Sequence, residues 1–127
     1  KYLVAEGNGG GDVNANRSAI GSWETFDVDL LSSGTCITSG ATVAVSTQGN
    51  HYLRATSGGG LDANASVVGS WEQLTLINHS DASGCLASGD SISLKSSSNL
   101  YLVAESNGNA NANRSAIGSW ERFAVQF

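Results

Sequence analysis

Residues 101–121 read YLVAESNGNANANRSAIGSWE, and two other stretches read almost the same: YLVAEGNGGGDVNANRSAIGSWE at residues 2–24 and YLRATSGGGLDANASVVGSWE at residues 52–72. Each stretch ends in Gly-Ser-Trp-Glu, and these three tryptophans, 48 and 49 residues apart, are all that the chain contains. Repetition at a fixed period of this size indicates three copies of one structural unit. A large aromatic residue beside a carboxylate in every copy also suggests three copies of one site.

The segments of this repeat have the pattern of short β-strands. Apolar and polar residues alternate in short runs, and Gly, Asn or Ser bounds each run. Between the repeated stretches lie Thr42–Ser46 and Ser91–Lys95, two more alternating runs that match each other. No stretch shows a helical period over about ten residues. Each unit of about 49 residues is therefore predicted to form four strands, and a threefold barrel capped by hairpins would cover their edges.

These motifs resemble the fascin-like branch of the β-trefoil family. The resemblance rests on Tyr-Leu-x-Ala, the Gly-rich turn and the Trp-Glu segment, and it covers nearly the whole chain. It implies an all-β fold, a β-trefoil with pseudo-threefold symmetry built from three four-strand repeats. We therefore expect a single β-trefoil domain over residues 1–127, with repeats at about 1–41, 42–90 and 91–127.

The first strand of repeat one is not evident in the sequence. Three four-strand repeats predict twelve strands, whereas eleven can be counted. The counterpart of Thr42–Ser46 would have to precede Lys1. Either residues outside this sequence form that strand, or another segment takes its place. Because an open seam leaves strand edges unpaired, we expect some compensation there.

Composition disfavours several classes of partner. The chain has 127 residues, of which 40% are hydrophobic and only 13% charged, and its net charge is −5 at pH 7. A negative chain repels phosphate backbones and anionic membrane surfaces, so we expect no nucleic acid partner and no membrane insertion. No apolar run is long enough to span a bilayer. The polar but weakly charged surface suits a secreted, extracellular protein, and the start at Lys1 rather than Met suggests a module separated from its upstream sequence.

The two cysteines, Cys36 and Cys85, occupy nearly equivalent places in their repeats. Equivalent positions in neighbouring repeats are usually far apart unless they lie near the symmetry axis, whereas a disulfide needs Cα atoms within about 7 Å. We therefore favour two buried free thiols that pack as small hydrophobic side chains, with a disulfide as the alternative. Two cysteines this far apart in sequence do not form a zinc signature.

The alternation of side chains in the last strand of each repeat predicts whether its tryptophan is buried in the core or exposed. In repeat one, Phe26, Val28 and Leu30 share the apolar face of the strand, and Trp23 lies in phase with the opposite, polar face. The same phase recurs in the other repeats, which predicts partly exposed tryptophans; a bulge at Gly-Ser would break this inference. Glu24 is in phase with the core, so it and its counterparts either accept hydrogen bonds from a ligand or receive backbone N–H groups.

Two further polar pairs recur in repeats one and three. Glu6 accompanies Arg17 in repeat one, and Glu105 accompanies Arg114 in repeat three, whereas repeat two has Thr and Ala at these positions. Because both members are lost together in repeat two, we expect structural ion pairs. Ligand binding by these residues is the alternative, and it would make repeat two the divergent site.

The pattern indicates a binding protein rather than an enzyme. Glycoside hydrolysis normally needs two carboxylates across one bond, whereas the repeated carboxylate stands singly in each unit. No catalytic triad, phosphate loop or metal-ligand cluster stands out, so we expect no catalytic residues, no metal and no cofactor. A flat indole suits stacking on a sugar ring, and a carboxylate accepts strong hydrogen bonds from hydroxyls. The candidate carbohydrate-binding residues are Trp23, Glu24, Trp71, Glu72, Trp120 and Glu121.

Among fascin-like trefoils, the pattern is most similar to carbohydrate-binding module family 92. That resemblance implies binding of β-1,6- and β-1,3-linked glucans, with the repeated Trp and Glu carrying up to three sites, and targeting of an attached enzyme to polysaccharide. We expect a monomer that forms one module of a larger enzyme. The alternatives are a lectin for galactosides and a fascin-like actin-binding domain, the latter disfavoured because acidic actin usually meets basic patches.

Overall fold

The computed structural model describes the backbone of residues 1–127 and every side chain except that of Asn8. Its strands confirm the predicted all-β class, and its η elements are single 3-10 turns. None of the helices in the described part of the chain has the length and apolarity of a membrane span. In chain order the elements are β1 (Tyr2–Ala5), α1 (Glu6–Gly9), β2 (Val13–Arg17), η1 (Ser22–Glu24), β3 (Phe26–Leu30), β4 (Thr42–Thr47), β5 (Tyr52–Ala55), β6 (Leu61–Ala65), η2 (Ser70–Glu72), β7 (Leu74–Asn78), β8 (Ser91–Lys95), β9 (Tyr101–Ala104), β10 (Ala110–Arg114), η3 (Ser119–Glu121) and β11 (Phe123–Ala124).

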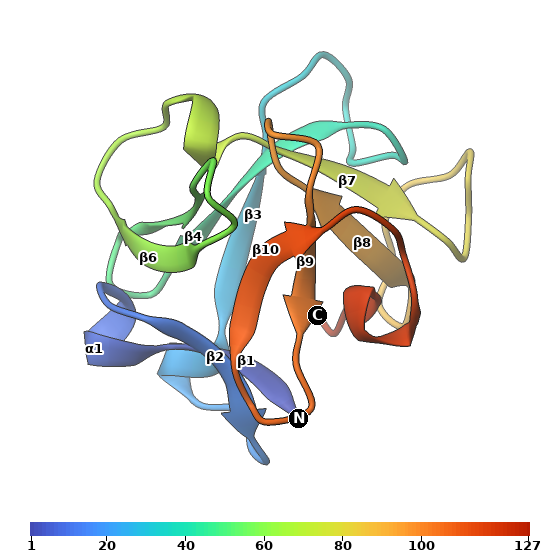
Figure 1. The fold of residues 1–127 in the computed structure, drawn as a ribbon. Helices are drawn as coiled ribbons and strands as arrows, with labels where there is room; N and C mark the ends of the chain where they lie inside the picture. The colour runs from blue at the N-terminus through green and yellow to red at the C-terminus, as the bar shows by residue number, and fades with distance from the viewer.

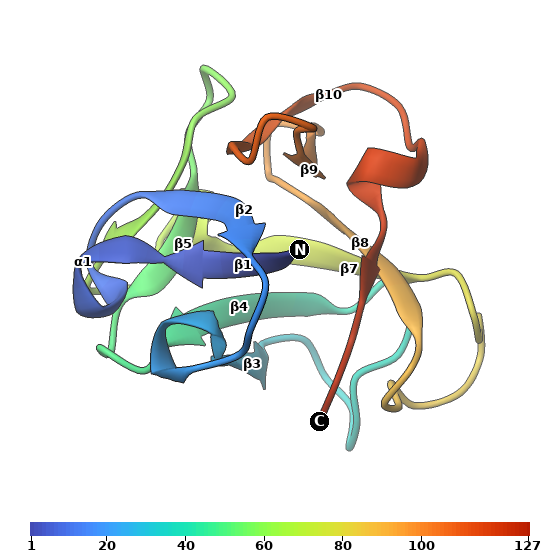
Figure 2. The same cartoon turned by 90° about the horizontal axis from the view of Figure 1, so that it is seen from below.

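Five strands form the wall of a nearly closed barrel (Figures 1 and 2). β4 pairs antiparallel with β3 and β7, and β8 pairs antiparallel with β7 and β11. Their apolar residues occupy alternate positions, and alternate side chains of a strand share one face. Val43, Leu74, Leu76 and Leu94 are accordingly buried, at no more than 6% exposure. Burial of these apolar side chains favours the strand conformation in β4, β7 and β8, whereas Val28 of β3 is 36% exposed at the edge of the sheet.

The hairpins β1–β2, β5–β6 and β9–β10 cover one end of the barrel. Their turns meet around a pseudo-threefold axis through three equivalent backbone hydrogen bonds. A Cβ atom at Gly59 would lie 2.7 Å from Asn113 Cβ, so this close approach of two hairpins requires glycine. The three bonds, 2.8–2.9 Å long, run from Ala15 N to Gly108 O, from Ala63 N to Gly11 O and from Ala112 N to Gly59 O. The predicted threefold arrangement is confirmed.

The barrel has an open seam between β3 and β11. Among the described residues, β3 pairs only with β4, and β11 pairs only with β8. The order of the repeats places the twelfth strand in this gap, as the counterpart of β4 and β8. A groove of about 370 Å³ lies there instead, lined by Phe26, Val28, Phe123 and Val125 and reached by Lys1. The count of eleven strands is confirmed, but no other segment of the described chain fills the missing place, so the expected compensation is not found.

Cys36 and Cys85 form a disulfide with Cα atoms 5.7 Å apart, so the prediction of free thiols is wrong. The two cysteines lie in the loops that follow β3 and β7. These loops are in direct contact, because Leu86 N donates a 2.7 Å hydrogen bond to Ile37 O. β3 and β7 both start at the hairpins, so their following loops converge at the other end of the barrel, and equivalent residues come within disulfide distance. A disulfide fits an oxidising compartment.

Candidate functional site

Each Gly-Ser-Trp-Glu segment folds into a 3-10 turn between a hairpin and a barrel strand. β3, β7 and β11 begin only two residues after the glutamate, so the strand phase does not apply to the tryptophans. In a 3-10 turn, successive side chains are rotated by about 120° instead, which turns Trp outward and Glu inward. The predicted exposure is nevertheless confirmed, because Trp23, Trp71 and Trp120 are 38%, 40% and 47% exposed.

The glutamate of each turn folds back to cap it. One carboxylate oxygen accepts a hydrogen bond from the backbone N–H of the glycine three residues earlier. Glycine leaves room for this contact, since a Cβ atom there would lie 3.1 Å from that oxygen. The bonds join Gly21 N to Glu24 Oε1 (2.8 Å), Gly69 N to Glu72 Oε1 (2.7 Å) and Gly118 N to Glu121 Oε1 (2.6 Å). The structural alternative for the glutamates is therefore observed, and ligand binding by them stays a prediction.

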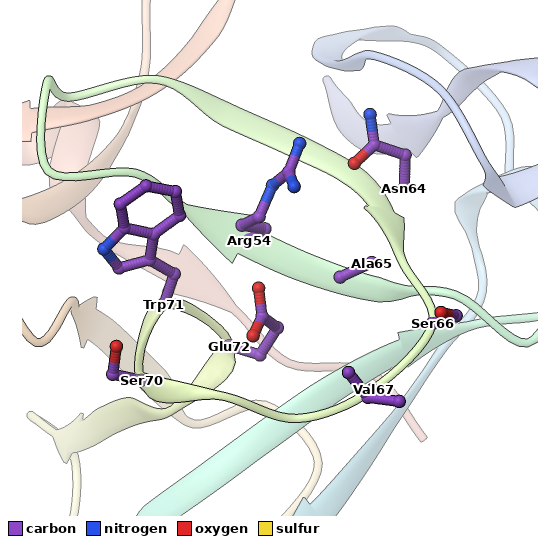
Figure 3. Close-up of a pocket in the computed structure, with 8 residues that line it drawn as sticks. All are labelled: Arg54, Asn64, Ala65, Ser66, Val67, Ser70, Trp71 and Glu72. Carbon is purple, nitrogen blue, oxygen red and sulfur yellow. The ribbon is translucent and has the colours of Figure 1, made fainter.

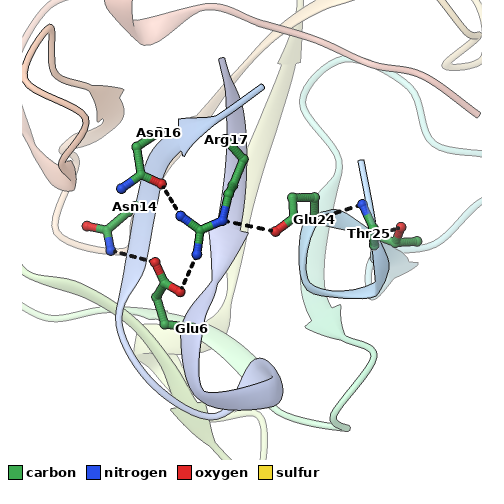
Figure 4. Close-up of polar contacts among 7 residues, drawn as sticks. Glu6, Asn14, Asn16, Arg17, Glu24 and Thr25 are labelled. Atoms are coloured by element: carbon green, nitrogen blue, oxygen red, sulfur yellow. Dashed lines mark hydrogen bonds and ion pairs between the residues drawn. The ribbon is translucent and has the colours of Figure 1, made fainter. Parts of the chain in front are cut away.

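In repeats one and three, an arginine guanidinium forms an ion pair with the capping glutamate, as Figure 4 shows for repeat one. Arg17 Nη2 lies 2.8 Å from Glu6 Oε1, and Arg17 Nε lies 3.7 Å from Glu24 Oε2. Asn16 Oδ1 accepts a further hydrogen bond of 2.8 Å from Arg17 Nη1. The equivalent ion pairs of repeat three are Arg114 with Glu105 and Arg114 with Glu121. The predicted ion pairs are confirmed, and each one extends to the tryptophan turn.

Repeat two keeps a guanidinium but takes it from a different strand. Arg54 of β5 stands opposite Asp62 of β6, and Arg54 Nη2 lies 2.8 Å from Asp62 Oδ2. This hydrogen bond, with the charges of Asp62 and Glu72, raises the pKa of Arg54 above its ordinary value, although desolvation opposes it. This pair has no charged counterpart in the other repeats, so the repeated motifs do not predict it. Its signal is that the same cross-strand positions hold uncharged Val4 and Asn14 in repeat one, so opposite charges appear together in repeat two.

An open depression of about 450 Å³ lies beside the tryptophan of repeat two (Figure 3). Its lining combines the indole of Trp71 with the guanidinium of Arg54 and the hydroxyls of Ser66 and Ser70. The volume falls within the range of small-molecule sites, about 300–1,000 Å³. A flat apolar surface beside several hydrogen-bonding groups can hold a ligand that has both an apolar face and a polar rim.

The residues around the turns offer hydrogen-bonding groups rather than metal ligands. Within the described residues, no three His, Cys, Asp or Glu side chains gather where they could hold a metal ion. His79 instead supports the turn of repeat three: its Nε2 lies 2.7 Å from Ser93 Oγ, which donates to Glu121 O. Burial first, and the charge of Arg122 second, lower the pKa of His79.

Comparison with known proteins identifies the fold. No family model matches the chain, and no curated protein matches it. Among solved structures, the SDF2-like protein from Arabidopsis thaliana aligns with a TM-score of 0.74, covering 98% of this chain and 87% of that chain at 13% sequence identity. The fold is a β-trefoil. The trefoil places the three Trp turns at equivalent positions, whereas the fascin-like branch and family 92 rest on the repeated motifs alone.

Loss of the hydrogen bond that caps a turn is expected to destabilise the trefoil more than loss of the charge of the capping glutamate. Glu121→Ala takes away the acceptor of the Gly118 N–H and should lower the free energy of unfolding by about 1–2 kcal/mol. Glu121→Gln keeps a neutral oxygen in the same place and should cost less. Urea unfolding followed by tryptophan fluorescence measures both variants. Equal free energies of unfolding for Glu121→Ala and the wild type would contradict the capping role.

Proposed function

We propose that this protein is a non-catalytic carbohydrate-binding domain whose ligand is a neutral β-glucan with β-1,6 or β-1,3 linkages. The observation that carries the proposal is the placement of three tryptophans, each 38–47% exposed, at equivalent positions on three braced turns. Exposure of a large apolar side chain is unfavourable in water, and its repetition at a fixed place is typical of a surface that meets a partner. The resemblance to family 92 supports the glucan class.

Stacking on the indole would orient the sugar. One face of a pyranose ring presents C–H groups that suit an aromatic surface, and the ring hydroxyls then lie at the rim. Arginine N–H groups can donate hydrogen bonds to those hydroxyl oxygens. The side chains of Arg17, Arg54 and Arg114 are 38%, 32% and 37% exposed, so each can present N–H groups to solvent and ligand. We assign stacking to Trp23, Trp71 and Trp120, and hydrogen bonding to these arginines.

The glutamates act first as positioning residues in this proposal. Oε1 of each one holds the turn, so Oε2 is the oxygen left to accept a hydrogen bond from a ligand hydroxyl. In repeats one and three, Oε2 also lies 3.7–3.8 Å from a guanidinium. We therefore assign a secondary role in ligand binding to Glu24, Glu72 and Glu121. The tryptophans and arginines make the main contacts in this proposal.

The charge of the site favours neutral glycans over anionic ones. In repeat one, two carboxylates (Glu6 and Glu24) surround one guanidinium (Arg17), which leaves a net negative charge that repels anionic polysaccharides. Both carboxylates are held by that guanidinium, whereas glycoside hydrolysis normally uses two carboxyl groups on either side of the scissile bond. We accordingly assign no residue a catalytic role.

Three sites on one small domain favour binding to a polymer. A single indole with a few hydrogen bonds gives weak affinity, but engagement of several sites by one polysaccharide can raise avidity by about 10²–10⁴. Such a domain suits the targeting of an attached enzyme to polysaccharide outside the cell, where the Cys36–Cys85 disulfide would persist.

Native affinity electrophoresis tests this proposal. The protein is run in gels that contain pustulan (β-1,6-glucan), laminarin (mainly β-1,3-glucan), cellulose derivatives or galactan, with bovine serum albumin as the non-binding reference. We expect retardation by pustulan and laminarin and none by galactan. Stronger retardation by galactan would favour the galactoside lectin, and a protein that no glycan retards would overturn the proposal.

A further inference from the structure

Repeat two carries an opening beside its tryptophan at a position that an arginine occupies in the other repeats. The register of the hairpins shows the equivalence: Arg17 stands opposite the tyrosine of β1, and Ala65 stands opposite the tyrosine of β5. Arg17 extends from β2 to both Glu6 and Glu24. Ala65 ends at its Cβ atom and lines the depression of about 450 Å³ beside Trp71 instead (Figure 3).

The exchange of residues in repeat two changes the shape of the site and leaves its charge alone. Arg54 replaces the missing guanidinium, and Asp62 with Glu72 supplies two carboxylates, so the group keeps an excess of one negative charge. An anionic substituent would therefore gain no more from repeat two than from repeat one. The added space favours a neutral group rich in hydroxyls.

The guanidinium of Arg54 has an unfavourable local environment in repeat two. Its Nε is buried and has no hydrogen-bond partner among the described residues. A buried donor without a partner is rare in native proteins and calls for an explanation. Placement of Arg54 on β5, rather than at position 65 on β6, keeps a guanidinium in the site while position 65 stays small. The unfavourable burial of Arg54 Nε is explained if ligand binding requires the opening beside position 65.

We infer that repeat two binds a branched glucan, with a backbone glucose stacked on Trp71 and a neutral glucosyl branch in the opening beside Ala65. Repeats one and three, where Arg17 and Arg114 fill this position, take unbranched segments. Ala65 is thus a specificity-determining residue. This inference rests on the proposed glucan-binding function and deepens it.

Single-site variants test the inference. Trp23→Ala/Trp120→Ala leaves the site of repeat two, and Trp71→Ala/Trp120→Ala leaves the site of repeat one. Isothermal titration measures the Kd of each for laminarihexaose and for the same hexaose with one β-1,6-linked glucosyl branch. The repeat-two variant should bind the branched ligand about tenfold more tightly than the linear one, which corresponds to one or two added hydrogen bonds. The repeat-one variant should show no such preference.

Exchange of the deciding residues should remove the preference. Arg54→Val, Thr56→Glu, Asp62→Asn and Ala65→Arg, made together in the repeat-two variant, rebuild the arrangement of repeat one. They should lower the ratio of branched to linear affinity to that of the repeat-one variant. Ala65→Ser is the matched control and should retain the preference. Ala65→Arg alone in the repeat-two variant fills the opening while Trp71 and Arg54 stay in place, so it should also abolish the preference. This single change keeps the test decisive if the fourfold exchange does not fold by circular dichroism.

Failure of this inference can be distinguished from failure of the proposed glucan-binding function. Equal branched-to-linear ratios in the two single-site variants, or a preference that survives the fourfold exchange, would overturn the inference and leave glucan binding standing. Absence of binding to either hexaose and to every polysaccharide by the wild-type protein would overturn the proposed function, and the inference with it.

Discussion

Replacement of all three tryptophans by alanine is expected to abolish retention on β-glucan, whereas each single replacement should only weaken it. Truncation of a central aromatic contact typically costs at least about 2 kcal/mol, which is roughly thirtyfold in affinity at that site. Loss of one site leaves two that can still engage the same polymer. Loss of all three also removes the avidity gain of about 10²–10⁴. Affinity electrophoresis on pustulan and laminarin measures the series Trp23→Ala, Trp71→Ala, Trp120→Ala and the triple variant.

The stability of the same variants separates binding from folding. Because Trp23, Trp71 and Trp120 are 38–47% exposed, each replacement should change the free energy of unfolding by less than about 1 kcal/mol. Leu31→Ala is the matched control, since Leu31 is 44% exposed and lies in a loop beyond β3. That variant should bind as the wild type does. A triple Trp variant that still binds, or one that unfolds, would show that the tryptophans are not the binding surface.

The exposure of the tryptophans could be predicted from the sequence, but the local structure that causes it could not. Strand alternation predicts the exposure only if the strand includes Trp23, whereas β3 begins at Phe26. A signal for the true structure was present, because glutamate three residues after a possible N-cap is the pattern of a capping box. The pattern is easily missed since the N-cap is Gly21, which has no side chain to complete the usual pair of contacts.

Contacts between repeats were the least predictable part of the fold. The three hairpins and the barrel strands follow from local alternation and turn residues, which lie close together in the sequence. The distance between Cys36 and Cys85 depends instead on where two loops 49 residues apart meet in space. The placement of the guanidinium in repeat two also depends on contacts in space. The sequence shows that repeat two lacks the counterpart of Arg17 and has Arg54 elsewhere. Only the pairing of β5 with β6 shows that Arg54 lies at the equivalent site.

Removal of the Cys36–Cys85 disulfide is expected to have the largest effect on stability. The bond closes a loop of 49 residues, and the loss of its entropic restraint on the unfolded chain corresponds to about 4 kcal/mol. For a domain of this size, that should lower the Tm by more than about 10 °C. Thermal unfolding of the double variant Cys36→Ser/Cys85→Ser, and of the wild type with and without dithiothreitol, measures the effect. The double variant with dithiothreitol is the control for the reductant itself.

The position of the disulfide also predicts where the protein should loosen first. β3 borders the open seam and has one strand partner, and the disulfide ties the loop after β3 to the loop after β7. Reduction should therefore speed hydrogen exchange in β3 before it affects β8, which is paired on both sides. The Trp turns lie at the opposite ends of β3 and β7, so glucan affinity should be unchanged below the lowered Tm. Equal midpoints with and without reductant, or uniform exchange across β3 and β8, would show that the bond does not restrain the seam.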